Sequence, residues 1–106
     1  MNKPSTADKM MTESDFQEWL RQLAIRTHWL YYHTHRSQHS VAGFPDTVLA
    51  KPPGKVIYAE LKTEDLKVSQ PSFDQWIWLH TLQHCEGTEA YLWRPSDRSF
   101  IEQLLL

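Results

Sequence analysis

The chain has little or none of several features that would mark common classes of protein. Its single cysteine, Cys85, excludes an internal disulfide and indicates a reducing compartment. No apolar run approaches membrane-spanning length, and the polar N-terminus lacks the apolar segment of a signal peptide. Internal repeats, low-complexity tracts and an excess of basic residues are also missing, since the formal net charge is −2. These absences predict a soluble protein of the cytoplasm.

The composition suits one small core. The 106 residues correspond to a single domain, and 41% of them are hydrophobic. Residues 1–11 are polar and unpatterned, so we expect a flexible N-terminus before a domain over residues 12–106. Five Trp, four Tyr and four Phe are many for such a core, which predicts some exposed rings and favours a homodimer. Three of the tryptophans are expected inside: Trp29, Trp76 and Trp93.

Three helices are predicted from caps and apolar stripes. A capping box at Thr12 begins the first helix, which ends near Arg26. Ser72 begins the second helix, which ends before Gly87. Residues 95–97 begin the last helix, whose apolar side chains are expected to face inward: Phe100, Ile101, Leu104 and Leu105.

Four strands are predicted from β-branched and aromatic runs, over residues 29–34, 46–50, 56–62 and 90–93. Residues 51–55 contain Pro-Pro-Gly and form a turn. The strand–helix–strand order at the end implies a right-handed crossover with parallel pairing. We therefore predict an α/β fold, a mixed four-stranded sheet flanked by helices in the order αβββαβα.

The predicted hairpin brings two acids together. Symmetric pairing about Pro53 places Ala50 opposite Val56 and, further along the ladder, Asp46 opposite Glu60. Directly opposed Cβ atoms are about 4.5–5.5 Å apart, so two carboxylates there repel unless a cation lies between them. The register depends on the turn alone, and a slip of one residue would separate the acids.

Two further charged groups extend this acidic pair. Strand alternation places Lys62 on the same face as Glu60, about 7 Å along the strand. A cation-binding carboxylate beside an ammonium suits metal-assisted phosphodiester hydrolysis, whereas the alternative is an ordinary surface ion pair. Glu13 lies at the edge of the first helix's apolar stripe and can face inward; the alternative is a helix acid favoured by the dipole.

These motifs resemble a known family of nucleases. Gly43-Phe44-Pro45-Asp46, then Glu60-Leu61-Lys62-Thr63, then a helix with Gln75, resembles the PD-(D/E)xK superfamily. The chain is most similar to the virus-type replication–repair nuclease (VRR-NUC) domain, especially its small stand-alone phage and bacterial members. The similarity covers nearly the whole chain from Thr12, and includes Thr12-Glu13, Trp29 to His33, Gly87 and Tyr91-Leu92-Trp93-Arg94-Pro95-Ser96-Asp97.

The resemblance implies a restriction-endonuclease-like fold and a role for each site residue. Asp46, Glu60 and the Leu61 carbonyl would bind Mg²⁺ or Mn²⁺, which prefer oxygen ligands, and Glu13 would reach the ion directly or through water. Lys62 would be the catalytic lysine. Gln75 matches the family's glutamine, although the connection after Lys62 is longer than usual and leaves Gln70 as a competitor. The products would carry a 5′-phosphate and a 3′-hydroxyl.

DNA contacts are expected from basic and polar groups beside the site. A loop with His35, Arg36 and Ser37, together with Arg94, suits contacts to phosphates. Further basic residues could form a local stripe: Arg21, Arg26, Lys51, Lys55, Lys67 and Arg98. The histidines also suggest zinc, because His33, His35 and His39 are close in sequence and His80 and His84 have helical spacing, but no cysteine pair accompanies them.

Three functions are compatible with these motifs. The first is a structure-selective endonuclease for branched DNA such as a Holliday junction, acting as a homodimer in a bacterial or phage-infected cell. The second is a catalytically inactive nuclease-fold module that binds DNA or protein; the intact set Asp46, Glu60 and Lys62 argues against it. The third, a sequence-specific restriction enzyme, is disfavoured because the chain has no spare domain for base readout. The preferred DNA structure, the number of cations and the pathway stay open.

Overall fold

The two longest helices begin at capping boxes, at Thr12 as the sequence predicts and at Ser72, for which the sequence predicts only the helix start. The computed structural model describes residues 3–35 and 41–106. Before α2 (Glu13–Arg26), the Thr12 Oγ1 accepts the Asp15 amide at 3.0 Å and the Asp15 carboxylate accepts the Thr12 amide. Ser72 and Gln75 exchange the same two bonds before α3 (Phe73–Gln83). Such caps each contribute about 1 kcal/mol to helix stability. The remaining elements are α1 (Thr6–Met10), β1 (Leu30–His33), β2 (Thr47–Lys51), β3 (Lys55–Leu61), β4 (Thr88–Trp93), the 3-10 turn η1 (Pro95–Asp97) and α4 (Arg98–Leu105).

The four strands form one mixed sheet in the order β1-β2-β3-β4. β1 and β2 pair antiparallel, as do β2 and β3, whereas β3 and β4 pair parallel. The β2–β3 hairpin has the predicted register, with Ala50 opposite Val56 and Thr47 opposite Ala59. These findings confirm the predicted mixed α/β sheet flanked by helices, and they confirm parallel pairing of the last strand.

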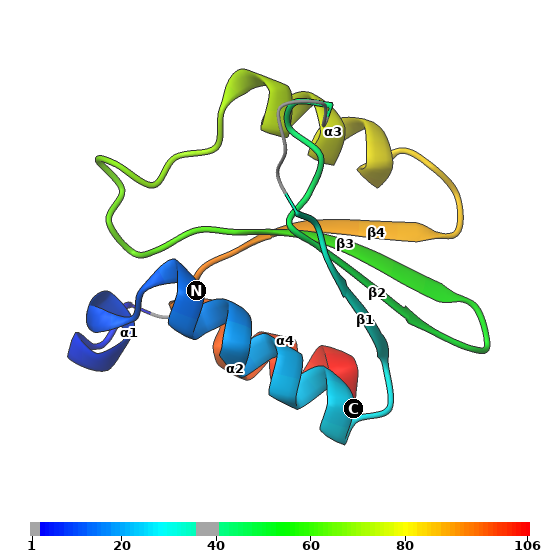
Figure 1. The fold of residues 1–106 in the computed structure, drawn as a ribbon, viewed down its shortest axis with the longest axis horizontal. Coiled ribbons are helices and arrows are strands. Elements are labelled where there is room, and N and C mark those ends of the chain that lie inside the picture. The colour runs from blue at the N-terminus through cyan, green and yellow to red at the C-terminus, as the bar shows by residue number, and fades with distance from the viewer. Residues whose placement is uncertain (1–2, 36–40) are drawn as a thin grey trace.

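Helices cover both faces of the sheet (Figure 1). α2 and α4 lie against one face, where the core includes Phe16, Leu20, Ile57 and Ile101, all with 0% exposure. The Trp29 Nε1 donates to the last turn of α4 at 2.9 Å and ties α4 to the segment before β1. α3 covers the other face, where the Phe44 ring contacts both Trp78 of α3 and Tyr58 of β3. The metal-site candidates lie at one end of the sheet, between these two layers.

Some individual expectations were wrong. Trp29 and Trp93 are buried as predicted, but Trp76 is 49% exposed and Phe100 is 51% exposed. Trp76 lies on the outer side of α3, and only the inner side of that helix contacts the sheet. The N-terminal segment also contains a short helix that the sequence did not predict, since α1 begins at a Ser5–Asp8 capping box and pairs Asp8 with Arg98 at 2.7 Å.

Within residues 3–35 and 41–106, none of the helices has both the length and the apolar character needed to cross a bilayer.

Candidate metal centre

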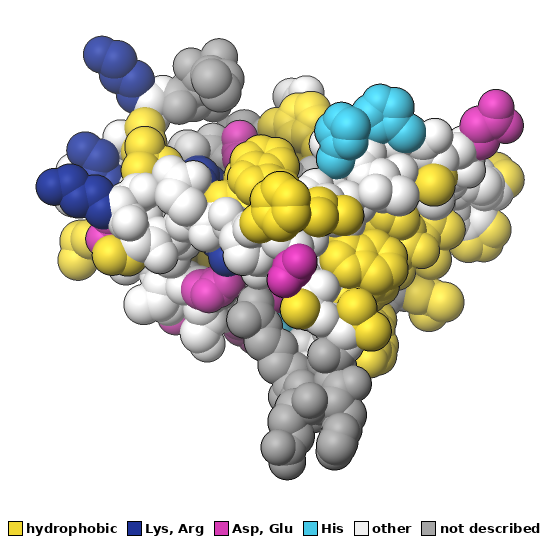
Figure 2. All heavy atoms as spheres, turned by 90° about the horizontal axis from the view of Figure 1, so that it is seen from above, with side chains coloured by type: hydrophobic (Ala, Val, Ile, Leu, Met, Phe, Trp, Pro, Cys, Tyr) yellow, Lys and Arg dark blue, Asp and Glu magenta, His cyan; other side chains and the backbone are white. Residues whose placement is uncertain are grey.

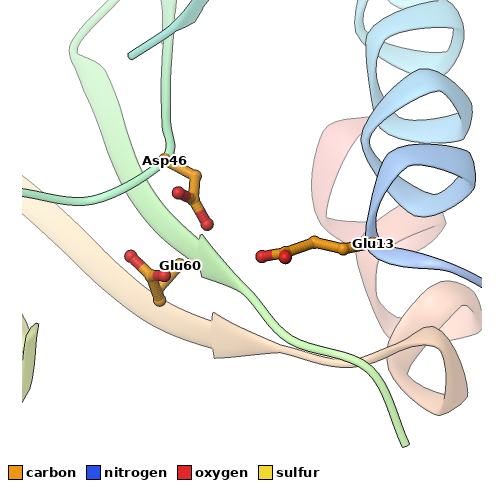
Figure 3. Close-up of side chains that lie close together, drawn as sticks. All are labelled: Glu13, Asp46 and Glu60. Atoms are coloured by element: carbon orange, nitrogen blue, oxygen red, sulfur yellow. The ribbon is translucent and has the colours of Figure 1, made fainter. Parts of the chain in front are cut away.

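Three carboxylates from three separate elements converge at the end of the sheet (Figure 3). Glu13 begins α2, Asp46 directly precedes β2, and Glu60 lies near the end of β3. One oxygen from each lies within 4.8 Å of the others. Asp46 is 9% exposed and Glu60 is fully buried, whereas Glu13 approaches from the solvent side. The structure thus brings together the three acids that the sequence analysis predicted to lie at the site.

The hairpin register explains why Asp46 and Glu60 meet. Pairing of Thr47 with Ala59, continued by one residue, places Asp46 opposite Glu60. The Asp46 Oδ2 accepts the Leu61 amide at 3.0 Å, so the side chain occupies the place of a ladder partner. Leu61 lies two residues beyond Ala59, the last β3 residue that pairs with β2. The predicted use of its carbonyl as a metal ligand stays a prediction.

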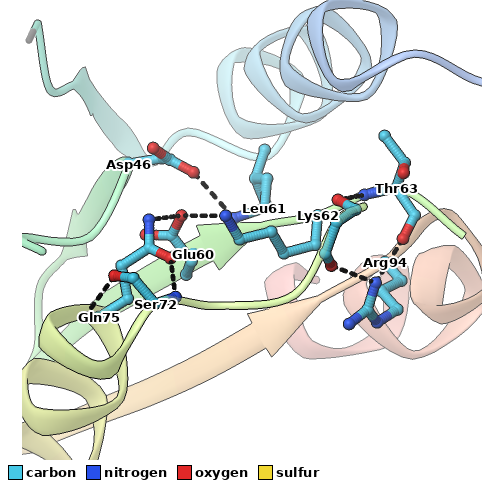
Figure 4. Close-up of polar contacts among 9 residues, drawn as sticks. Asp46, Glu60, Leu61, Lys62, Thr63, Ser72, Gln75 and Arg94 are labelled. Carbon is cyan, nitrogen blue, oxygen red and sulfur yellow. Dashed lines mark hydrogen bonds and ion pairs between the residues drawn. The ribbon is translucent and has the colours of Figure 1, made fainter. Parts of the chain in front are cut away.

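Lys62 and Gln75 flank Glu60 (Figure 4). The Lys62 Nζ lies 3.5 Å from the Glu60 Oε2, and its side chain is only 12% exposed. The Gln75 Nε2 donates to the same carboxylate oxygen at 2.9 Å, while its Oε1 accepts the Ser72 amide. Gln75 is 5% exposed. Gln70 is exposed and donates to the Leu66 carbonyl, so the structure places Gln75, and not Gln70, beside the acids.

The segment before Asp46 is packed closely against α3. Gly43 has φ +88, and a Cβ there would lie 2.5 Å from the Asp74 carbonyl carbon. Only glycine combines this left-handed backbone with so close an approach. Phe44 then contacts Trp78 and Tyr58 edge-on, with ring centroids 5.1 and 6.1 Å apart. These contacts couple the position of Asp46 to the helix that carries Gln75.

A cleft of about 690 Å³ opens beside Glu13, Asp46 and Lys62, and its walls include residues of α2 and β1. Sequence reasoning missed part of its lining, notably Gln17 and Tyr31. The Gln17 Nε2 donates to the Tyr31 hydroxyl and to the Thr47 Oγ1, the latter at 2.9 Å, and so links α2 to two strands. Burial raises the pKa of the Tyr31 phenol. Gln17 follows Glu13 by one helical turn, so both lie on the same side of α2. That spacing could have identified Gln17 as a residue of the cleft. His33 and His35 line the same cleft.

The proposed basic stripe is weakened by local partners. Arg21 pairs with Glu18 at 2.7 Å, and hydrogen bonds from Arg21 and Gln22 lower the pKa of Glu18 to about 2. Lys55 pairs with Glu89 at 2.9 Å. Lys51 donates to a backbone carbonyl and Arg98 pairs with the acid of α1.

The predicted DNA contacts are only partly described by the structure. Arg36 and Ser37, like His39, lie outside the described residues, and His35 stands at the mouth of the cleft. Arg94 instead contacts the backbone, because its Nη1 donates to the Thr63 and Ser69 carbonyls. The Nη1 group is therefore bound to protein oxygens.

The donor set fits a hard divalent cation. Carboxylate and carbonyl oxygens suit Mg²⁺ or Mn²⁺, and three carboxylates so close together repel one another in a buried site. In the parts of the chain that the structure describes, no group containing a histidine or cysteine could hold a metal ion. The zinc alternative therefore gains no support from the described histidines.

Comparison of the chain with protein-family models, with curated proteins and with solved structures gave no match.

Proposed function

We propose that the protein is a divalent-metal-dependent DNA endonuclease that hydrolyses phosphodiester bonds. The observation that carries this proposal is the convergence of Glu13, Asp46 and Glu60 within 4.8 Å, with the Lys62 ammonium 3.5 Å from Glu60. A structural ion pair would need one carboxylate for one ammonium. Three acids and one amine at the end of a cleft instead suit a bound cation and a reacting phosphate.

Each side chain has a chemical role in this proposal. Asp46, Glu60, the Leu61 carbonyl and Glu13 would hold Mg²⁺ or Mn²⁺. The cation supplies charge neutralisation for the phosphate oxygens and a lower pKa for a bound water. Lys62 orients the attacking water and stabilises the negative charge that develops on the phosphoryl oxygens. Gln75 fixes the Glu60 carboxylate through its Nε2 and thereby keeps the pair with Lys62 aligned.

The substrate and the assembly follow from the same proposal. The resemblance to the VRR-NUC domain of the PD-(D/E)xK superfamily suggests branched DNA, such as a Holliday junction, and products with a 5′-phosphate and a 3′-hydroxyl. Cutting both strands of a two-fold symmetric junction needs two sites, which a homodimer supplies. Apolar side chains are exposed on the face that carries α3 (Figure 2), and those of Phe73, Trp76 and Ile77 are compatible with self-association. The cytoplasm of a bacterial or phage-infected cell is the proposed setting.

A second candidate is a module that keeps the nuclease fold but binds DNA or protein without cutting. The observation that favours it is that three residues of the expected basic stripe, Arg21, Lys55 and Arg98, are paired with acids. Binding to phosphates depends on such charges. The complete set of acids and Lys62 favours the enzyme.

One assay separates the two candidates. Labelled four-way junction, nicked and linear DNA are incubated with the wild type and with Glu60→Ala and Lys62→Ala, with and without Mg²⁺ or Mn²⁺. We expect wild-type cleavage only with the metal, and no cleavage by either variant, although circular dichroism shows both folded. Glu102→Ala, an exposed acid on α4, is the matched control and should cleave normally. Binding without cutting under any divalent cation would support the module.

A further inference from the structure

The segment between β3 and α3, residues 62–72, projects from the body of the molecule (Figure 1). It begins at Lys62, beside the acids. Its tip is a turn that carries two exposed apolar side chains, Leu66 at 59% and Val68 at 81% exposure, with the exposed Lys67 between them. The nuclease proposal assigns no role to these three residues.

The base of this loop is held by hydrogen bonds (Figure 4). The Arg94 Nη1 donates to the carbonyls of Thr63 and Ser69, and the Thr63 amide donates to the Ser69 Oγ at 2.8 Å. One guanidinium thus joins the two sides of the loop and fixes them to the end of β4. The loop's acids also bind backbone: Glu64 accepts the Ser96 amide at 2.6 Å, and Asp65 accepts the Lys67 amide at 3.1 Å. The tip is therefore presented on an ordered base.

We propose that Leu66 and Val68 form a wedge that inserts between bases of DNA at a point where stacking is already interrupted, while Lys67 contacts a phosphate. This inference rests on the proposed nuclease function. Apolar side chains on minor-groove and architectural proteins unstack base steps in this way. Lys67, standing between the two apolar residues, supplies the charge complementary to the backbone. Arg94 is then a positioning residue for the loop.

A second copy of the chain fits this tip less well. A stable homodimer buries about 800 Å² on each partner. A two-residue tip that projects from the surface offers far less area than this, whereas an apolar wedge between bases needs only a few side chains. The wedge also predicts a substrate class. A continuous duplex must be unstacked at a cost, and a branch or nick needs little unstacking, so the loop favours interrupted DNA.

The test compares substrates of the same sequence that differ only in a branch or nick. Leu66→Gln combined with Val68→Gln should reduce the ratio of kcat/KM for interrupted DNA to that for continuous duplex by about 10-fold, because two apolar side chains lose their burial between bases. Ile25→Gln, an equally exposed change on α2, is the matched control and should keep the wild-type ratio. An unchanged ratio in the double variant overturns the wedge.

A second readout does not depend on cleavage. A 2-aminopurine placed at the branch should brighten on binding of the wild type without divalent cation, and should not brighten with the double variant. If the wild type brightens the probe but cuts nothing, the nuclease proposal fails and the wedge stands. If the double variant brightens the probe as the wild type does, the wedge fails. Loss of self-association with unchanged DNA binding also overturns it, because the tip would then be a protein contact.

Arg94→Lys tests the positioning role. Arg94 reaches both carbonyls with the Nη1 of a rigid planar guanidinium, and the flexible lysine side chain positions its ammonium less firmly, so the substrate ratio should fall in the same direction as in the double variant. Hydrogen exchange at the Thr63 amide should become faster. Because Arg94 acts through the tip, combining the variants should add nothing to the loss of preference. Additive losses would show that Arg94 acts elsewhere.

Discussion

Replacing Glu60 by glutamine should stabilise the cation-free protein and abolish its stabilisation by Mn²⁺. Glu60 is fully buried, and its carboxylate lies within 4.8 Å of the oxygens of Glu13 and Asp46. Glutamine keeps the shape and an acceptor for the Gln75 amide, but it removes the charge. The variant therefore changes the electrostatics of the cluster with little change in packing.

The magnitude follows from the distances. At an effective dielectric constant of 20, two like charges at 4.8 Å repel by about 3.5 kcal/mol. The Lys62 ammonium at 3.5 Å attracts Glu60 by about 4.7 kcal/mol on the same basis. Two repulsions exceed one attraction, so Glu60→Gln should gain about 2 kcal/mol without metal. That gain corresponds to a rise in Tm of roughly 10 °C in a domain of this size.

Thermal unfolding followed by circular dichroism measures this change, first in EDTA and then in Mn²⁺. The wild type should gain about 1.4 kcal/mol when Mn²⁺ is tenfold above its Kd, and Glu60→Gln should gain nothing. Glu102→Gln, an exposed matched substitution, should stay within about 0.5 kcal/mol of the wild type in both conditions. The reasoning is refuted if Glu60→Gln is less stable than the wild type in EDTA, or if Mn²⁺ stabilises both proteins equally.

Three further predictions concern the surroundings of the site. Gln75→Leu should lose about 2 kcal/mol of unfolding free energy by chemical denaturation, because a buried charged hydrogen bond and a cap disappear, whereas Gln70→Leu should be nearly neutral; equal effects would contradict the assignment of Gln75. Gly43→Ala should lower both Tm and cleavage rate, since its Cβ would overlap the α3 backbone; a normal Tm would show that the approach is looser. Burial and the hydrogen bond to Glu89 raise the pKa of Tyr91 to about 12, so its stabilising contribution is complete below the ordinary tyrosine pKa of about 10 and is lost as the pH rises through 12. Ultraviolet titration should show one phenol near 12 that is absent in Tyr91→Phe.

Local signals predicted most of the fold. Thr12 and Ser72 mark helix starts through capping boxes, and the Pro-Pro-Gly turn fixes the register that places Asp46 opposite Glu60. Both the helix caps and the turn depend on residues a few positions apart, so both can be predicted from the sequence alone. The side-chain alternation that pairs Glu60 with Lys62 is equally local.

Features that depend on contacts between distant segments were not predictable in the same way. The exposure of Trp76 and Phe100 depends on which side of each helix packs against the sheet. Whether Gln70 or Gln75 reaches Glu60 depends on where α3 begins after a long connection. α1 is short and polar, and it is attached through an ion pair to Arg98, far away in sequence. The hydrogen bonds from Arg94 to Thr63 and Ser69 join the end of β4 to the loop after β3. No repeating pattern in the sequence predicts them.

The most direct test of the central claim is a titration of ¹⁵N-labelled protein with Mn²⁺, observed by NMR. The Leu61 amide and the Gln75 side-chain amide donate to Asp46 and Glu60, so a cation held by these acids should broaden both signals first. The Trp29 indole signal, from the far end of α4, should persist. Selective broadening that disappears in Asp46→Asn is the predicted result. Broadening that is uniform, or that begins elsewhere, would contradict a metal centre at these three acids.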